Sequence, residues 1–299
     1  MAYGLSAYLL WGMLTVYWKE LTGLSPFELI GQRIVWSFAL LAVVLGITRN
    51  WAWLRTVGRD PKLVGRIALA AVLLAANWTT YVWCVTHGNV VETALGYFIA
   101  PLGTVFIGVV VLHERLRRAQ VGALALAVLA VLVLTVGYGS VPWFALVLGT
   151  TWSVYGLLKR LVPLSSIQSL TAETLVLLPA AVGLVIVLEA AGDGITSTAT
   201  AWQMVLVVLS GAVTTVPLLL FAAAAKRVPF TTLGPLQYVV PTINFLLGVA
   251  VYGEPMPAWR LAGFALVWVA LAVITVDSVH AARRYRVAAP ALEPAVEPA

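Results

Sequence analysis

The sequence predicts an all-α integral membrane protein of ten transmembrane helices, arranged as a 5+5 inverted-topology repeat. Three observations predict this fold class. Hydrophobic residues make up 62% of the 299 residues and charged residues only 10%, whereas a soluble domain carries about 25% charged residues. Apolar runs long enough to cross a bilayer recur along the whole chain. The sequence also matches itself weakly at a constant offset of 140 residues.

Each apolar run is interpreted as one helix, because a spanning helix needs about 20 apolar residues. The first run has no basic segment before it and is interrupted by Trp11, Tyr17 and Trp18, so we expect a retained helix and not a signal peptide. Short clusters of Lys and Arg separate many of the other runs. The ten runs are 4–22, 27–48, 65–86, 91–112, 118–136, 141–160, 166–188, 202–225, 230–252 and 257–279.

The distribution of Lys and Arg predicts the orientation, because cytoplasmic loops of membrane proteins carry an excess of these residues. With the N-terminus in the cytoplasm, 15 of the 18 Lys and Arg residues fall in cytoplasmic segments. Only Lys19 and Arg260 fall outside, and Arg33 lies within an apolar run. We therefore expect a multi-pass protein of the cell (plasma or inner) membrane with both termini in the cytoplasm.

The internal repeat defines the predicted domains. Because each unit contains five helices, an odd number, the second unit enters the membrane from the opposite side, which is typical of secondary transporters. The predicted units are residues 1–140 and 141–287, and the Ala/Pro/Glu segment 288–299 is predicted to be a disordered cytoplasmic tail. Polar and special residues that coincide are Lys19 with Lys159, Ser25 with Ser165, Pro101 with Pro241, Gly108 with Gly248, and Glu114 with Glu254.

Pro101 and Pro241 are candidate hinges. Each lies about 15 Å into its helix, at 1.5 Å per residue, and therefore close to the bilayer midplane. A proline removes one backbone hydrogen bond and kinks a helix, and matched breaks in matched helices point to a transporter's binding site. The alternative is that proline is simply frequent in membrane helices.

Polar and aromatic residues gather near these prolines and are the candidate solute-binding residues. Rings with one polar edge suit an organic, partly apolar solute. The alternative for Tyr81 is the aromatic belt at the membrane surface. For the amides of Asn77, Gln237 and Asn244, the alternative is a hydrogen bond that only holds two helices together. The candidates are Asn77, Trp78, Tyr81, Tyr97, Gln237, Tyr238 and Asn244.

Two charges, Arg33 and Glu173, lie inside apolar runs and at equivalent repeat positions. Charges at membrane depth are costly and usually functional. We hypothesise that Arg33 attracts an anionic or polar group of the solute. Glu173, interpreted as a lone carboxylate in a low-dielectric site, is the candidate for carrying a coupling proton. The alternative for both is a structural charge satisfied by polar neighbours, and whether they interact stays open.

Glu114 and Glu254 follow the C-terminal ends of two equivalent helices. An acid is disfavoured at a helix C-terminus and favoured at an N-terminus. We therefore expect these two acids to serve the start of the helix that follows each of them.

The chain resembles the EamA family of the drug/metabolite transporter superfamily over roughly residues 1–285, and within it the RarD-type permeases. The resemblance implies a permease with a cavity between the two repeats. Permeases of this type are commonly labelled by chloramphenicol sensitivity or resistance, but these residues do not select chloramphenicol over another metabolite. The stretches that carry the resemblance are Pro101, Gly108 and Glu114, their counterparts Pro241, Gly248 and Glu254, Asn77-Trp78, Glu92 with 95–98, 214–218, 232–234, Gln237-Tyr238, and Arg33 with Glu173.

The sequence therefore predicts a secondary transporter of a small organic solute, with alternating access between the two repeats and proton coupling as a hypothesis. Its partners would be the solute and the lipid bilayer, with a homodimer left open and no nucleic acid. We expect no enzyme, because no His lies at membrane depth and no acid pair shares a helix face. No cofactor or metal site is predicted. The alternatives are a channel and a non-transporting membrane scaffold.

Overall fold

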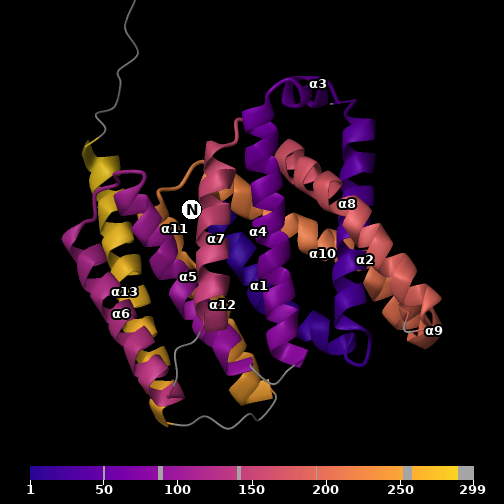
Figure 1. The fold of residues 1–299 in the computed structure, drawn as a ribbon. Coiled ribbons are helices and arrows are strands. Elements are labelled where there is room, and N and C mark those ends of the chain that lie inside the picture. Colours follow the sequence, from indigo (N-terminus) through magenta and orange to yellow (C-terminus); the bar gives the residue numbers. More distant parts are fainter. Residues whose placement is uncertain (50, 87–89, 140–142, 193, 252–257, 289–299) are drawn as a thin grey trace, which may run out of the picture.

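The computed structural model describes residues 1–49, 51–86, 90–139, 143–192, 194–251 and 258–288. Over these ranges the regular structure is helical, and Figure 1 shows the helices in order. The helices are α1 (Ala2–Glu20), α2 (Pro26–Ile47), α3 (Trp53–Gly58), α4 (Pro61–Thr86), α5 (Val90–Val110), α6 (Arg118–Tyr138), α7 (Trp143–Leu161), α8 (Ser166–Ala190), α9 (Ile195–Thr198), α10 (Ala201–Ala225), α11 (Phe230–Leu236), α12 (Val239–Leu246), the π-helical turn η1 (Leu247–Val251) and α13 (Ala258–Ala288).

Among the described residues, every predicted apolar run corresponds to helical structure, with the ninth run divided into α11, α12 and η1. Five helices, α2, α4, α6, α8 and α10, contain stretches long and apolar enough to cross a membrane. The chain is therefore a multi-pass membrane protein. The short helices α3 and α9, which lie in connecting segments, were not predicted.

Several helices begin at a residue whose side chain accepts a backbone hydrogen bond. Ser25 accepts from the N–H of Glu28 just before Pro26 opens α2. Ser165 caps α8 and Thr200 caps α10 in the same way, each paired with a glutamine three residues later. Such caps satisfy donors that the first helical turn leaves unpaired. Ser25 and Ser165 are equivalent in the repeat, so both halves start their second helix alike.

The break in the ninth predicted helix lies just before Pro241. Because Pro241 has no N–H, the carbonyl of Gln237 cannot accept the usual helical hydrogen bond from it. The N–H of Val240 donates to that carbonyl instead, over 3.1 Å, and the helix divides between Leu236 and Val239. Pro101 lies inside the continuous helix α5. The two equivalent prolines therefore differ in whether the helix is divided beside them, and the hinge role of both stays a prediction.

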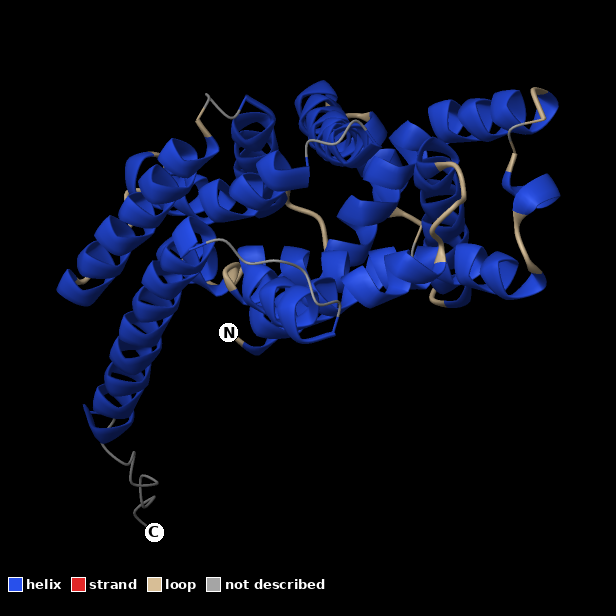
Figure 2. Cartoon of the chain, turned by 90° about the horizontal axis from the view of Figure 1, so that it is seen from below, coloured by secondary structure: helices blue, strands red, loops and turns tan. Residues whose placement is uncertain are grey.

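The contacts between helices come in pairs that the 140-residue offset exchanges. The contact of α4 with α7 has its equivalent in that of α10 with α1. The contact of α5 with α7 has its equivalent in that of α12 with α1, and the contact of α2 with α10 in that of α8 with α4. The equivalent pairs α2–α8 and α6–α13 pack on each other. Figure 1 shows α6 and α13 side by side at one flank, and in Figure 2 the C-terminal helix projects beyond the rest.

The segments predicted to share one side of the membrane meet at one end of the bundle. Trp53 and Val57 of α3 pack with Val162 and Leu164, which follow α7. At the other end, Leu21 and Leu24, which follow α1, pack with Ile195 and Leu206. This separation agrees with the predicted loop sides, although which end faces the cytoplasm stays a prediction.

Candidate solute-binding site

Arg33 lies on α2 with its guanidinium among aromatic rings. Its Nε donates to Oγ1 of Thr214 on α10 over 3.1 Å. The guanidinium carbon lies 4.0 Å from the ring centre of Trp78 on α4 and 5.1 Å from that of Trp18 on α1. A cation within about 6 Å of a ring centre is attracted by the ring's quadrupole. Three helices from both halves of the chain thus hold this charge.

Tyr81 and Tyr97 extend the aromatic surface beside Arg33. Their ring centres lie 6.2 Å apart, and both residues lie close enough to Arg33 to interact with it electrostatically. Tyr81 is 37% exposed and Tyr97 38% exposed, so both residues lie partly outside the packed interior. The structure therefore brings together four of the predicted site residues, namely Arg33, Trp78, Tyr81 and Tyr97.

Glu173 on α8 is not the lone carboxylate that the sequence analysis expected. Lys159 on α7 forms an ion pair with it, with Nζ 2.7 Å from Oε1, and both side chains are 1% exposed. Ser169 donates to Oε1 over 2.9 Å and also accepts from Lys159. Tyr155 donates its hydroxyl to Oε2 over 3.1 Å. A buried charge needs such partners, so the first premise of the coupling hypothesis, an unpaired carboxylate, is wrong.

A small cavity, which we call the Glu173 pocket, lies between the Arg33 and Glu173 groups. Glu173, Thr214 and Trp78 line it, together with Thr215. The hydroxyl oxygen of Thr215 is buried there without a hydrogen-bond partner. The free volume of about 10 Å³ corresponds to about one water molecule. Among the described side chains, Arg33 and Glu173 form no ion pair with each other, but Glu173 and two partners of Arg33, Trp78 and Thr214, border one cavity.

The remaining candidate residues form hydrogen bonds between helices. Asn77 donates to the carbonyl of Leu148 and to the hydroxyl of Thr151, each over 2.9 Å. Gln237 donates to Thr104 over 2.8 Å, and Tyr238 donates its hydroxyl to the carbonyl of Phe98 over 3.1 Å. These contacts match the alternative that the sequence analysis left open. The side chain of Asn244 lies outside the described part of the chain.

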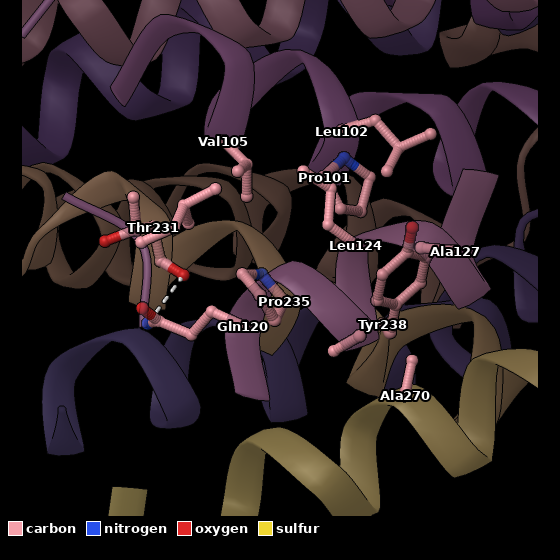
Figure 3. A pocket seen from close by; sticks show the side chains of 12 residues that line it. Pro101, Leu102, Val105, Gln120, Leu124, Ala127, Thr231, Pro235, Tyr238 and Ala270 are labelled. Carbon is pink, nitrogen blue, oxygen red and sulfur yellow. Dashed lines mark hydrogen bonds between the residues drawn. The ribbon is translucent and has the colours of Figure 1, made fainter. Parts of the chain in front are cut away.

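Pro101 and Tyr238 border a second small pocket, which Figure 3 shows from close by. Pro235 and the hydrogen-bonded pair of Gln120 and Thr231, whose Nε2 and carbonyl oxygen lie 3.4 Å apart, also line it. Its free volume of about 10 Å³ again corresponds to about one water molecule. Helices α5, α6, α11 and α13 therefore pack closely around the first candidate hinge.

Glu114 lies at a helix N-terminus, as expected, but at that of α11 and not of α6, the next helix along the chain. Its Oε1 accepts from the N–H of Phe230 over 3.0 Å and its Oε2 from the N–H of Thr231 over 2.9 Å. Arg160 at the end of α7 pairs with Oε1 over 2.9 Å. The carboxylate therefore ties the loop after α5 to α7 and α11. Glu254 lies outside the described residues.

Lys226, at the end of α10, is a further charged residue at the same end of the bundle as Arg160 and Glu114. Its ammonium donates to the carbonyl oxygens of Val162 and Leu164. Burial lowers the pKa of Lys226, and the positive charges of Lys159 and Arg227 lower it further.

Sequence reasoning missed Lys159, Tyr155, Trp18 and Thr214. Lys159 was counted among the cytoplasmic loop charges, because it lies in the last turn of an apolar run. The available signal was its position within run 141–160, beside a helix that carries a buried acid. For Trp18 and Thr214 the sequence holds no such signal, since only the packing of α1 and α10 on α2 brings them to Arg33.

Comparison with known proteins assigns the fold to a family. A model of the EamA-like transporter family matches residues 1–136 and, a second time, residues 140–276. The chain belongs to the EamA-like transporter family. Protein RarD of Streptomyces exfoliatus is 44% identical to this EamA-like transporter over 98% of the chain and 93% of its own length. "Uncharacterized transporter PA0485" of Pseudomonas aeruginosa is 42% identical over 94% of each chain.

A solved crystal structure gives the same fold for this EamA-like transporter. The two structures align with a TM-score of 0.69 at 22% identity, over 92% of this chain and 96% of the other. The family match and the 44% identical RarD relative show that the chain is a membrane transporter of the RarD type, as the resemblance implied.

Proposed function

We propose that this EamA-like transporter is a secondary transporter that moves a small organic solute by alternating access between two five-helix repeats. The observation that carries the proposal is the double match of the family model, to residues 1–136 and 140–276. The exchange of helix contacts under the 140-residue offset supports it. So does the contact of Phe98 with its equivalent Tyr238, whose ring centres lie 6.0 Å apart, because equivalent residues meet only near an axis that relates the halves.

The solute site in this proposal is the aromatic group around Arg33. Helices α1, α4 and α10 supply the partners of Arg33, which lies on α2, so Arg33 lies where the two halves meet. The cavities described above have room for about one water each, whereas organic ligands need about 300–1,000 Å³. We therefore infer that the site enlarges when the halves move relative to each other.

We expect Pro101→Ala and Pro241→Ala to express and fold but to slow transport. The break at Pro241 separates α11 from α12, and restoring an N–H there would favour one continuous helix. Saturable counterflow of a metabolite mixture in proteoliposomes is the measurement, since a channel would show no exchange. We expect at least a fivefold loss of exchange rate for Pro241→Ala. Normal exchange by both variants would make the prolines packing features only.

The proposed topology places both termini in the cytoplasm. Cysteines introduced at positions 56 and 117 should react with a membrane-impermeant reagent only from the cytoplasmic side, and a cysteine at position 193 only from outside. The native Cys84 is buried and should be replaced by Ser first, so that each variant carries one thiol. Labelling of any of the three from the opposite side would contradict the inverted repeat.

A further inference from the structure

The guanidinium of Arg33 forms no ion pair with any acid in the part of the chain whose side chains the structure describes. The ion pairs there join Lys159 to Glu173, Arg160 to Glu114 and Arg117 to Asp277. Glu28, in the first turn of α2, instead accepts from the N–H of Ile195 over 2.7 Å and from the amide of Gln32 over 3.2 Å. Because a cation at membrane depth is costly without a partner, Arg33 needs an anion from outside these residues.

The edge of the Arg33 guanidinium that carries the two terminal nitrogens can bind that anion. Among the described residues, its hydrogen bond to Thr214 uses only Nε, so the four N–H groups of the two terminal nitrogens are left for a ligand. The ring centres of Trp78 and Trp18 lie 4.0 and 5.1 Å from the guanidinium carbon, and these two contacts orient the planar group. A fixed planar fork matches the two oxygens of a carboxylate.

The charges of the Arg33 side chain and of the buried Lys159–Glu173 pair also limit the charge of the ligand. The charges of Lys159 and Glu173 cancel each other, so the net charge of Arg33 and this pair together is +1. A monoanion brings this sum to zero, whereas a neutral solute leaves +1 and a dianion gives −1. Since uncompensated charge is costly in a low-dielectric region, the singly charged anion is favoured.

We propose that the transported solute is an aromatic organic monoanion whose carboxylate binds the terminal nitrogens of Arg33 and whose ring lies against Trp78, Tyr81 and Tyr97. This inference rests on the proposed transport function and names its substrate class. A zwitterionic amino acid suits the site less well, because its ammonium group meets Arg33 and no acid among the described side chains. An organic cation is repelled by the same guanidinium.

The test uses probes with one ring and different charges. Purified full-length protein in lipid nanodiscs is titrated with phenylacetate, 2-phenylethanol, phenylalanine and 2-phenylethylamine at constant ionic strength, and binding is read from tryptophan fluorescence and thermal shift. Phenylacetate should bind saturably and at least tenfold more tightly than the other three. Equal binding of 2-phenylethanol or of 2-phenylethylamine would overturn the charge assignment, and tighter binding of phenylalanine would replace the monoanion with a zwitterion.

Substitutions of Arg33 test whether this residue binds the carboxylate of phenylacetate. Arg33→Gln should lose phenylacetate binding by at least tenfold, and Arg33→Lys, which keeps the charge and favours folding, should lose it as well because it lacks the fork. Arg55→Gln, in the exposed part of α3, is the matched control and should bind as the parent does. Unchanged binding by Arg33→Lys overturns the bidentate contact. A tenfold gain in Glu92→Gln would identify Glu92 as a counter-ion of Arg33 and would overturn the charge sum.

The transport proposal is judged separately by counterflow. If labelled phenylacetate binds through Arg33 but is not exchanged in proteoliposomes, the site assignment holds and the transport function fails. If a metabolite mixture shows saturable exchange while phenylacetate neither binds nor competes, the transport function holds and the substrate class is wrong.

Discussion

Lys159→Met should destabilise this EamA-like transporter severely, whereas the double variant Lys159→Met/Glu173→Gln should restore most of the loss. Removing one partner of a buried ion pair leaves an uncompensated charge and costs about 3–5 kcal/mol, while replacing both partners is often close to neutral. Both side chains are 1% exposed, so water cannot compensate either charge. At about 2–4 °C per kcal/mol for a chain above 150 residues, the single variant should melt roughly 6–20 °C lower.

The measurement is the fraction of detergent-solubilised protein that stays monodisperse after heating. Arg117→Gln is the matched control, because it breaks an ion pair with Asp277 whose side chains are 39% and 22% exposed, and such pairs contribute about 1 kcal/mol or less. Parental stability of Lys159→Met would mean that Glu173 is protonated in the folded protein and that Tyr155 and Ser169 suffice for it.

The same double variant tests the coupling hypothesis without a folding defect. We propose that the Lys159–Glu173 pair, and not Glu173 alone, takes up the coupling proton. Met and Gln cannot take up a proton. The double variant should therefore no longer accumulate solute in response to a pH gradient, although it should still exchange solute. Accumulation equal to that of the parent would exclude the pair as the coupling site and leave it a structural role.

The sequence predicted the helices well, because a spanning helix must be apolar along its whole length. The short helices α3 and α9 were missed because six and four residues carry too little periodicity. Arg33 and Glu173 could be singled out by the cost of a charge at membrane depth. Their partners could not, since Thr214 is 181 residues from Arg33 and is brought to it only by the packing of α10 on α2.

Chemical type alone also could not separate binding residues from packing residues. Gln237 and Tyr97 occupy equivalent repeat positions, and both were candidates for solute binding. In the structure Gln237 is 6% exposed and donates to Thr104, whereas Tyr97 is 38% exposed beside Arg33. The difference arises because α11 packs directly against α5, and a hydrogen bond between two packed helices uses the same side chains that would contact a solute.

Gly211→Ala should disrupt the crossing of α2 and α10 that positions Arg33. A Cβ atom at Gly211 would lie 2.5 Å from the backbone carbonyl carbon of Trp36 and 2.6 Å from its oxygen, so the two helices would have to separate. Close approach of backbones through small residues is how membrane helices commonly associate. At the same crossing, Ser37 donates to the carbonyl of Gly211 over 3.3 Å, and Thr214 binds Arg33 one turn further along.

We therefore expect Gly211→Ala to lose about 3 kcal/mol, the upper range for overpacking, and to bind phenylacetate at least tenfold more weakly because Thr214 moves away from Arg33. Gly183→Ala in α8 is the control, since no atom lies within 4 Å of its added methyl. Alanine there should be neutral or stabilise the helix by about 0.5–1 kcal/mol. The thermal-shift assay gives both stability and binding. Equal melting temperatures for the two variants would show that α2 and α10 do not meet as closely as the structure has them, and the packing that holds Thr214 against Arg33 would then be wrong.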